Sequence, residues 1–118
     1  MDIYILVIIL LLYFIVKPLI LNDLNSEKVK KKVEEGAVII DVRTDGEYEV
    51  SHLDSSVHIP LANLKVRIDN TAPDKGKAIL LHCRSGSRSF AAKRILKGMG
   101  YSSVYNLGSF SRAKKMVT

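Results

Sequence analysis

The segment from His82 to Ser89 holds the residues best suited to chemistry, because two arginines, Arg84 and Arg88, closely follow the one cysteine of the chain. It reads His-Cys-Arg-Ser-Gly-Ser-Arg-Ser. A free thiol has a pKa of about 8.5, and only the ionised form is a strong nucleophile. Neighbouring arginines and a helix N-terminus lower that pKa to about 7 or below. The segment therefore predicts a reactive, largely ionised thiol at Cys83, next to groups that bind anions.

The elements on either side of this segment are a short apolar run and a helical pattern. Residues 78–81 are Ala-Ile-Leu-Leu, which is typical of a strand buried on both faces. After the loop, apolar residues recur at helical spacing as far as Gly100, a C-terminal cap signal. We therefore expect Cys83 at a strand-to-helix turn, where free backbone N–H groups of residues 84–88 converge on the sulfur or on a bound anion.

Two alternative roles in this segment have to be weighed. Free cysteines are often small buried hydrophobic residues, but an inert Cys83 would not need five polar or turn-forming residues directly after it. His82 is adjacent to the thiol, yet neighbouring strand residues point to opposite faces. We therefore expect His82 to be packed or hydrogen-bonded rather than to act as the base.

The loop and several distant segments resemble the single-domain rhodaneses, the thiosulfate sulfurtransferases. The matching segments outside the loop are Asp41-Val42-Arg43, Ser51-His52-Leu53, Ile59-Pro60-Leu61, Gly98-Met99-Gly100-Tyr101 and Val104-Tyr105-Asn106-Leu107-Gly108. The resemblance runs from about Ser26 to the end and is strongest to the phage-shock-protein E group. It implies an enzyme in which Cys83 takes a sulfane sulfur from thiosulfate or another donor as a persulfide. The sulfur then passes to a thiophilic acceptor, a thiol or a protein.

The same resemblance implies roles for the neighbours of Cys83. The residues expected to bind a small sulfur-containing anion are Arg84, Ser85, Gly86, Ser87 and Arg88. An arginine matches an oxyanion through its planar fork, and glycine allows a tight turn. Asp41 and Arg43, at the end of a neighbouring strand, are expected to support the site from behind. A buried pair that holds loops together is the alternative for these two.

Two other functions stay open. A protein phosphatase signature has five residues between its cysteine and arginine, whereas four separate Cys83 from Arg88. The shorter loop encloses a smaller anion, which favours sulfur transfer over phosphate-ester hydrolysis. The other alternative is a membrane-tethered persulfide relay or docking module with little thiosulfate activity.

The N-terminus is apolar without a break from Ile3 to Val16, and the pattern extends past Lys17 and Pro18 to Leu21. We expect residues 1–21 to form a single-pass membrane anchor. A cleaved signal peptide is the alternative, but the basic start and the small-residue cleavage site are missing. Lysines follow the apolar segment, so the positive-inside rule places the domain in the cytoplasm. The resembling group is typically exported, which leaves the periplasmic side as the alternative.

Residues 22–118 are expected to form one domain of the α/β class, because helical and strand patterns alternate. The expected strands are 37–42, 57–59, 78–82 and 103–106, and the expected helices are 27–35, 45–50, 61–69, 88–98 and a terminal one. This order predicts a small parallel sheet with helices on both faces. The net charge is +6, but no aromatic residues interleave with the basic ones, so nucleic-acid binding is not expected. Cysteine and histidine spacing predicts no metal, and no cofactor is expected.

Overall fold

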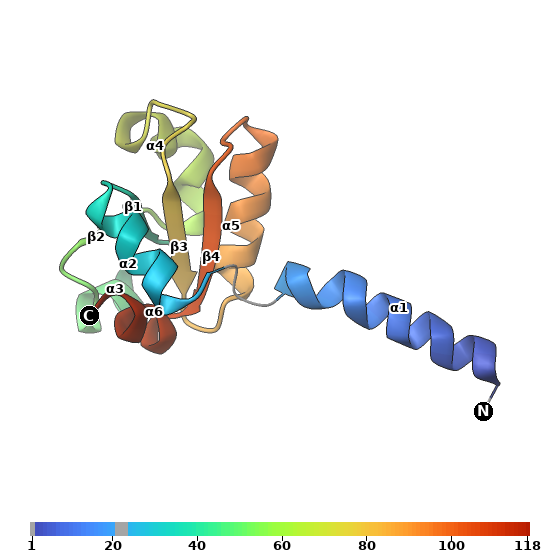
Figure 1. Ribbon diagram of the computed structural model, residues 1–118. Helices are drawn as coiled ribbons and strands as arrows, with labels where there is room; N and C mark the ends of the chain where they lie inside the picture. The colour runs from blue at the N-terminus through green and yellow to red at the C-terminus, as the bar shows by residue number, and fades with distance from the viewer. Residues whose placement is uncertain (1, 21–23) are drawn as a thin grey trace.

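A computed structural model of the protein describes residues 2–20 and 24–118, without the side chains of 17–20. Its centre is a parallel sheet with the strand order β2-β1-β3-β4 (Figure 1). The strands are β1 Val38–Asp41, β2 Ser56–His58, β3 Ile79–Cys83 and β4 Val104–Ser109. All five residues of β3 are buried, which confirms the expectation of a strand covered on both faces. The parallel strands bring Asp41 and Cys83 to the same edge of the sheet.

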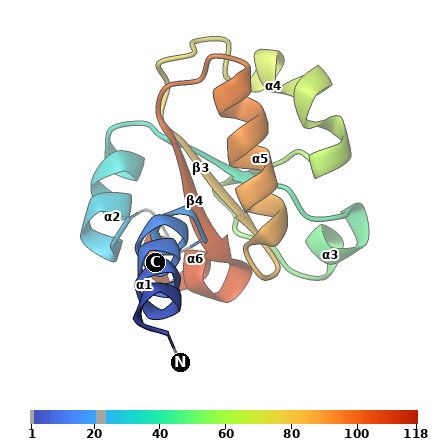
Figure 2. The ribbon, with the colours of Figure 1, turned by 90° about the vertical axis from the view of Figure 1, so that its right-hand side faces the viewer.

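Helices cover both faces of this sheet (Figure 2). They are α2 Ser26–Glu34, α3 Asp45–Val50, α4 Leu64–Thr71, α5 Ser87–Gly98 and α6 Phe110–Val117, with a 3₁₀ turn at Leu61–Asn63 before α4. One core joins α4 and α5 to the sheet through Ile68 and Leu96. The other core joins α2 and α6 to the opposite face through Val29 and Met116. The predicted α/β class with helices on both faces is confirmed.

Local signals position the helices that frame the cysteine loop. Helix α3 begins with a reciprocal cap, in which Thr44 Oγ1 accepts from the Glu47 N–H and the Glu47 carboxylate accepts from the Thr44 N–H. Helix α5 begins directly after Gly86, whose φ is +101°. At its other end Gly100 has a φ of +99°, in agreement with the predicted cap. The site therefore lies where β3 passes through a glycine turn into α5.

Helix α1 spans Ile3–Ile20 and extends away from the sheet in Figure 1. Its described side chains, Ile3 to Val16, are all exposed. Within residues 2–20 and 24–118, no helix is long and apolar enough to cross a membrane. At 1.5 Å per residue, the 18 residues of α1 cover about 27 Å, less than the roughly 30 Å of a hydrocarbon core. The predicted membrane-spanning anchor is thus not supported, and the expected boundary at residues 21–22 lies outside the described residues.

Candidate active site

Cys83 is the last residue of β3, and three donors surround its sulfur. The Gly86 N–H donates to Cys83 Sγ at 3.0 Å, and the N–H and Oγ of Ser89 each lie 3.4 Å from it. The two backbone donors come from Gly86, directly before α5, and from Ser89, in the first turn of α5. N–H groups at the start of a helix have no hydrogen-bond partner inside the helix. Of the N–H groups of residues 84–88 that the sequence predicts to converge on the sulfur, that of Gly86 donates to it, and the second backbone donor, Ser89, lies one residue beyond that range.

The surroundings of Cys83 act on its pKa in opposite directions. The residue is fully buried, and burial raises the pKa of a thiol. Hydrogen bonds from Ser89, Gly86 and Ser85 lower it and outweigh burial, so the pKa of Cys83 lies below its ordinary value. The thiol is thus both buried and stabilised as an anion, whereas a reactive cysteine is usually partly exposed.

Gly86 allows the loop to turn close against the backbone of β4 at Gly108. A side chain at this position would place its Cβ 3.4 Å from the Cα of Gly108, and the φ of +101° is one that other residues rarely adopt. We expect Gly86→Ala to lower the free energy of unfolding by about 1–2 kcal/mol. Denaturant unfolding measures this change.

Gly46→Ala is the matched control for that substitution, because nothing lies within 4 Å of the added Cβ and the position is helical. We expect it to be neutral or slightly stabilising. Equal stability of the two variants would contradict the role given to the turn at Gly86.

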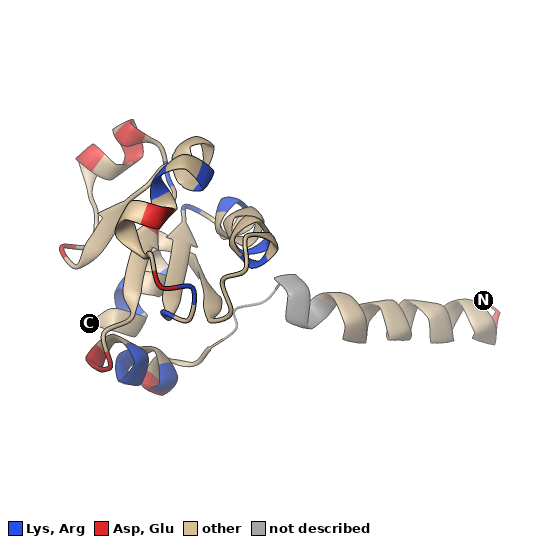
Figure 3. Ribbon diagram, turned by 90° about the horizontal axis from the view of Figure 1, so that it is seen from above, with Lys and Arg blue, Asp and Glu red and all other residues tan. Residues whose placement is uncertain are grey.

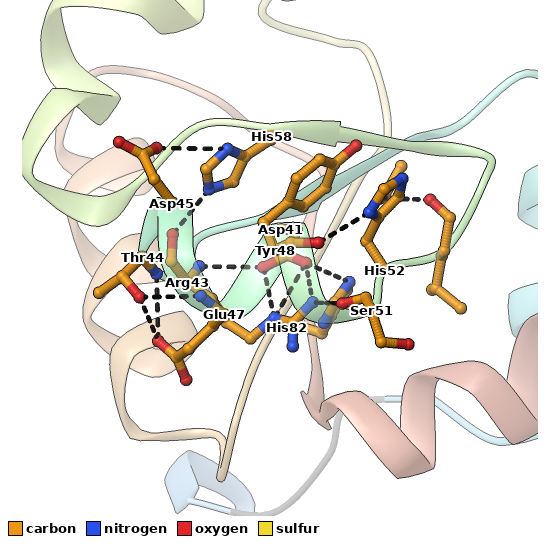
Figure 4. Close-up of polar contacts among 12 residues, drawn as sticks. Asp41, Arg43, Thr44, Asp45, Glu47, Tyr48, Ser51, His52, His58 and His82 are labelled. Carbon is orange, nitrogen blue, oxygen red and sulfur yellow. Dashed lines mark hydrogen bonds and ion pairs between the residues drawn. The ribbon is translucent and has the colours of Figure 1, made fainter.

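Asp41 and Arg43 form a buried pair beside the end of β3 (Figure 4). Arg43 Nη2 lies 2.7 Å from Asp41 Oδ2, and its Nε donates to both carboxylate oxygens at 3.0 Å. Arg43 Nη2 also donates to the Ser51 carbonyl at 2.7 Å. The sequence leaves two roles open for this pair, support of the active site from behind or a buried pair that holds loops together. The geometry favours the second role.

His82 points to the face opposite Cys83, as strand alternation predicts. Its ring is fully buried, with Nε2 3.8 Å from Asp41 Oδ2 and the Phe110 ring centroid 5.9 Å away. Within residues 24–118, neither ring nitrogen has a hydrogen-bond partner. Burial lowers the pKa of His82, while Asp41 acts in the opposite direction. His82 is therefore a packed residue and not a base for the thiol.

A stack of three rings fastens α3 to the sheet (Figure 4). The Tyr48 ring lies between His52 and His58, with centroid separations of 3.8 and 4.2 Å. His58 Nε2 donates to the Arg43 carbonyl at 2.8 Å. Because α3 also carries Glu47, this stack fixes the carboxylate that faces the cysteine loop.

Glu47 is the partner of Arg88, a contact that the sequence does not indicate. The two carboxylate oxygens accept from Arg88 Nη1 at 2.6 Å and from Nη2 at 2.9 Å. The Arg88 guanidinium lowers the pKa of Glu47 to about 2. The residue expected to orient an anion is thus already engaged by a carboxylate, and it ties α5 to α3.

A cavity of about 490 Å³ opens beside the loop. Its walls are Arg43, Glu47, Val50, Ser51, Arg84, Phe110 and Ser111. Arg84 is exposed, as are Ser85 and Ser87. Among the described residues, no group of three or more metal-ligating side chains is arranged to hold an ion. The cavity combines an exposed cation with apolar walls, which suits an anion or an organic thiol.

The sequence model of the family described as "Rhodanese-like domain" matches residues 25–115 of this chain. The chain belongs to the rhodanese-like domain family. Among its relatives, "Thiosulfate sulfurtransferase PspE" of Escherichia coli is 41% identical over 69 residues, which cover 58% of this chain and 66% of the relative. "Putative sulfur carrier protein YrkF" of Bacillus subtilis is 36% identical over 87 residues, 72% of this chain and 46% of that protein.

Solved structures agree with this rhodanese-like domain. A "rhodanese with anions from E. coli" superposes with a TM-score of 0.63 at 36% identity, over 65% of this chain and 91% of that one. The human single-domain sulfurtransferase TSTD1 gives a TM-score of 0.65 at 18% identity, over 75% of this chain and 91% of that one, and so supports the fold.

The pair between Glu47 and Arg88 in this rhodanese-like domain predicts a pH-dependent stability difference. We expect Glu47→Gln to lower the free energy of unfolding at pH 7 by about 0.5–1 kcal/mol, since the pair is partly exposed. The folded pKa of about 2 lies below the ordinary 4.5, so the contribution is complete above about pH 4.5 and is lost as pH falls through 2. Urea unfolding should therefore give a smaller difference in the free energy of unfolding between the wild type and Glu47→Gln at pH 3 than at pH 7.

Glu49→Gln, an exposed position on the same helix, is the control for this comparison. It removes the same charge without removing the ion pair. An equal loss of stability in both variants would show that general charge, and not the pair with Arg88, is responsible.

Proposed function

We propose that this domain is a sulfurtransferase that carries a sulfane sulfur as a persulfide on Cys83. The observation that carries the proposal is the convergence of the Gly86 and Ser89 donors on Cys83 Sγ. Such donors stabilise the Cys83 thiolate, which is the attacking group in the first half of the reaction and the leaving group in the second. The relative named thiosulfate sulfurtransferase supports thiosulfate as a donor.

The reaction balances without an added oxidant. The Cys83 thiolate attacks the outer sulfur of thiosulfate, a new S–S bond forms, and the S–S bond of thiosulfate breaks as sulfite leaves with the electron pair. An acceptor, cyanide or a thiolate, then attacks the outer sulfur of the persulfide. The Cys83–sulfur bond breaks, and the electron pair returns to Cys83 as thiolate. Cys83 is both nucleophile and leaving group, and both roles benefit from a lowered pKa.

Arg84 is the cation best placed to attract the donor. It is exposed in the wall of the cavity beside the loop, where its fork can pair with sulfonate oxygens. Ser85 and Ser87 add hydroxyl donors at the same exposed rim. Arg88, paired with Glu47, holds the start of α5 against α3 and so fixes the geometry of the loop.

An assay of the purified protein with two substrates tests the proposal against the phosphatase alternative. We expect thiocyanate from thiosulfate and cyanide, and no phosphate from an aryl phosphate. Phosphate release without thiocyanate formation would overturn the proposal.

The exposed apolar side chains of α1 favour one second candidate, a membrane-tethered persulfide relay that exchanges sulfur with a partner protein. Mass spectrometry of Cys83 after exposure to thiosulfate separates the two. A persulfide with rapid turnover by cyanide supports the enzyme, and a persulfide with slow turnover supports the relay. No added sulfur would leave a docking role.

We further propose that residues 1–21 hold the domain at a membrane with the domain on the cytoplasmic side. The exposed apolar side chains from Ile3 to Val16 support attachment to lipid. Lysines on α2 suit anionic headgroups, and Figure 3 marks the positions of Lys and Arg along the ribbon in blue.

The side of the membrane is tested with an exposed thiol, because Cys83 is buried. Thr118→Cys in a Cys83→Ser background places one exposed cysteine at the end of the domain. We expect a membrane-impermeant thiol reagent to label it in inverted vesicles and not in intact cells. Labelling from outside would contradict the cytoplasmic placement and favour the periplasmic side.

A further inference from the structure

Asn106 is a buried polar residue on β4 that contacts three parts of the active-site framework. Its Oδ1 accepts from Ser89 Oγ at 2.7 Å and from the Gly108 N–H at 2.9 Å. Its Nδ2 donates to the Gly86 carbonyl at 3.3 Å. The residue is 3% exposed. One amide thus joins the loop, the start of α5 and the irregular end of β4, where the pairing register with β3 shifts.

The two residues that Asn106 holds next to the sulfur are those that donate to it. Gly86 gives its N–H to Cys83 Sγ while its carbonyl faces Asn106. Ser89 Oγ lies 2.7 Å from Asn106 Oδ1, 3.0 Å from the Gly86 carbonyl and 3.4 Å from Cys83 Sγ. A hydroxyl has a single hydrogen, so these three acceptors share one donor. A charged sulfur competes for that hydrogen far better than a neutral thiol does.

We propose that Asn106 is a positioning residue, which acts through Gly86 and Ser89 to keep their donors aimed at Cys83 Sγ. By holding the Gly86 carbonyl, it fixes the backbone of Gly86 in the orientation in which the Gly86 N–H faces the sulfur. It also holds Ser89 Oγ within reach, so that the hydroxyl hydrogen turns from Asn106 to the sulfur when the thiol ionises. The inference deepens the proposed sulfur transfer and rests on it, because it concerns the thiol that carries the sulfur.

Other charged groups also surround the thiol, and the test has to leave them in place. They are Arg84 in the loop, Arg88 on α5 with its partner Glu47 on α3, the Asp41–Arg43 pair at the end of β1, and His82 on the opposite face of β3. Substitution of Asn106 changes none of these residues. A change in Cys83 ionisation in the variant would therefore report on the hydrogen bonds of Gly86 and Ser89.

The experiment is a titration of the Cys83 thiolate by its ultraviolet absorbance. Cys83→Ser serves as the blank, because the chain has one cysteine. We expect Asn106→Ala to raise the midpoint by about one pH unit, the size expected for the loss of one hydrogen bond to a charged group. Ser89→Ala should raise it similarly, and the double variant should show less than the sum of the two shifts. Asn70→Ala, an exposed position on α4, should leave the midpoint unchanged.

The titration needs neither a sulfur donor nor an acceptor, so its outcome is separate from that of the sulfur-transfer assay. A folded Asn106→Ala variant with a lower melting temperature and an unchanged midpoint would overturn the inference and leave a purely structural role. Fully additive shifts in the double variant would show that Asn106 does not act through Ser89. If Asn106→Ala does not fold, Asn106→Leu, which is closer in volume and has no side-chain hydrogen-bonding atom, is titrated instead, and an unchanged midpoint there would overturn the inference equally.

Discussion

Cys83→Ser is expected to reduce thiocyanate formation from thiosulfate and cyanide to about one thousandth or less of the wild-type rate. A serine hydroxyl is not ionised near neutral pH, and its oxygen cannot form the S–S bond of a persulfide. The chain has no second cysteine that could replace the thiol. The measurement is the initial rate of thiocyanate formation by the purified variant.

Two controls make the loss specific to the chemistry. The unfolding midpoint of Cys83→Ser should stay close to that of the wild type, since oxygen replaces sulfur in the same buried position. Asn70→Ala, an exposed substitution on α4 away from the loop, should retain most of the activity. Substantial thiocyanate formation by a folded Cys83→Ser variant would rule out the persulfide mechanism.

Asp41→Ala is expected to lower the free energy of unfolding by about 3–5 kcal/mol, the largest loss of stability among these substitutions. The Asp41 side chain is fully buried, and that of Arg43 is 7% exposed. Removing the carboxylate leaves the guanidinium buried with the Ser51 carbonyl as its remaining acceptor among the described hydrogen bonds. The measurement is denaturant unfolding at pH 7.

The pH dependence of Asp41 gives a second readout of the same pair. Burial raises the pKa of this carboxyl, but the hydrogen bonds and charge of Arg43, together with the charge of His82, bring it below its ordinary 3.8. Its contribution is therefore complete above the unfolded pKa and is lost as pH falls through the lower folded value.

Asp54→Ala, at an exposed position, should change stability little. An equally small loss in Asp41→Ala would contradict a structural role for the pair.

The strand, turn and helix that surround the thiol could be predicted from the sequence, because each of these elements depends on residues that are neighbours along the chain. The apolar run of β3, the glycine turn and the helical spacing of α5 are contiguous in the sequence, so the Gly86 N–H lies close to the end of that strand. The expected helix at 61–69 is partly wrong. The chain forms a 3₁₀ turn at Leu61–Asn63 after Pro60 and then continues as α4 to Thr71.

The side-chain partners of the loop were not predictable in the same way. Glu47 and Arg88 are 41 positions apart, and Asn106 is 17 positions from Ser89. Only the order of strands in the sheet brings these residues together. A capping signal does mark Glu47, three residues after Thr44, but it indicates a helix start and not an ion pair with α5. Two weak signals mark Asn106: it is a polar residue beside apolar ones in its strand, and it lies in a segment that resembles the rhodaneses.

The pairing of Arg88 with Glu47 has a consequence for the attraction of substrate from solution. Arg43 is neutralised by Asp41, and Arg88 by Glu47. In the described part of the cavity wall, Arg84 is then the cation without a carboxylate partner. A single exposed charge is strongly screened beyond a Debye length of about 8 Å at physiological ionic strength. The cavity wall by itself thus adds little long-range steering of a dianion, and selection among anions depends on contacts made after arrival.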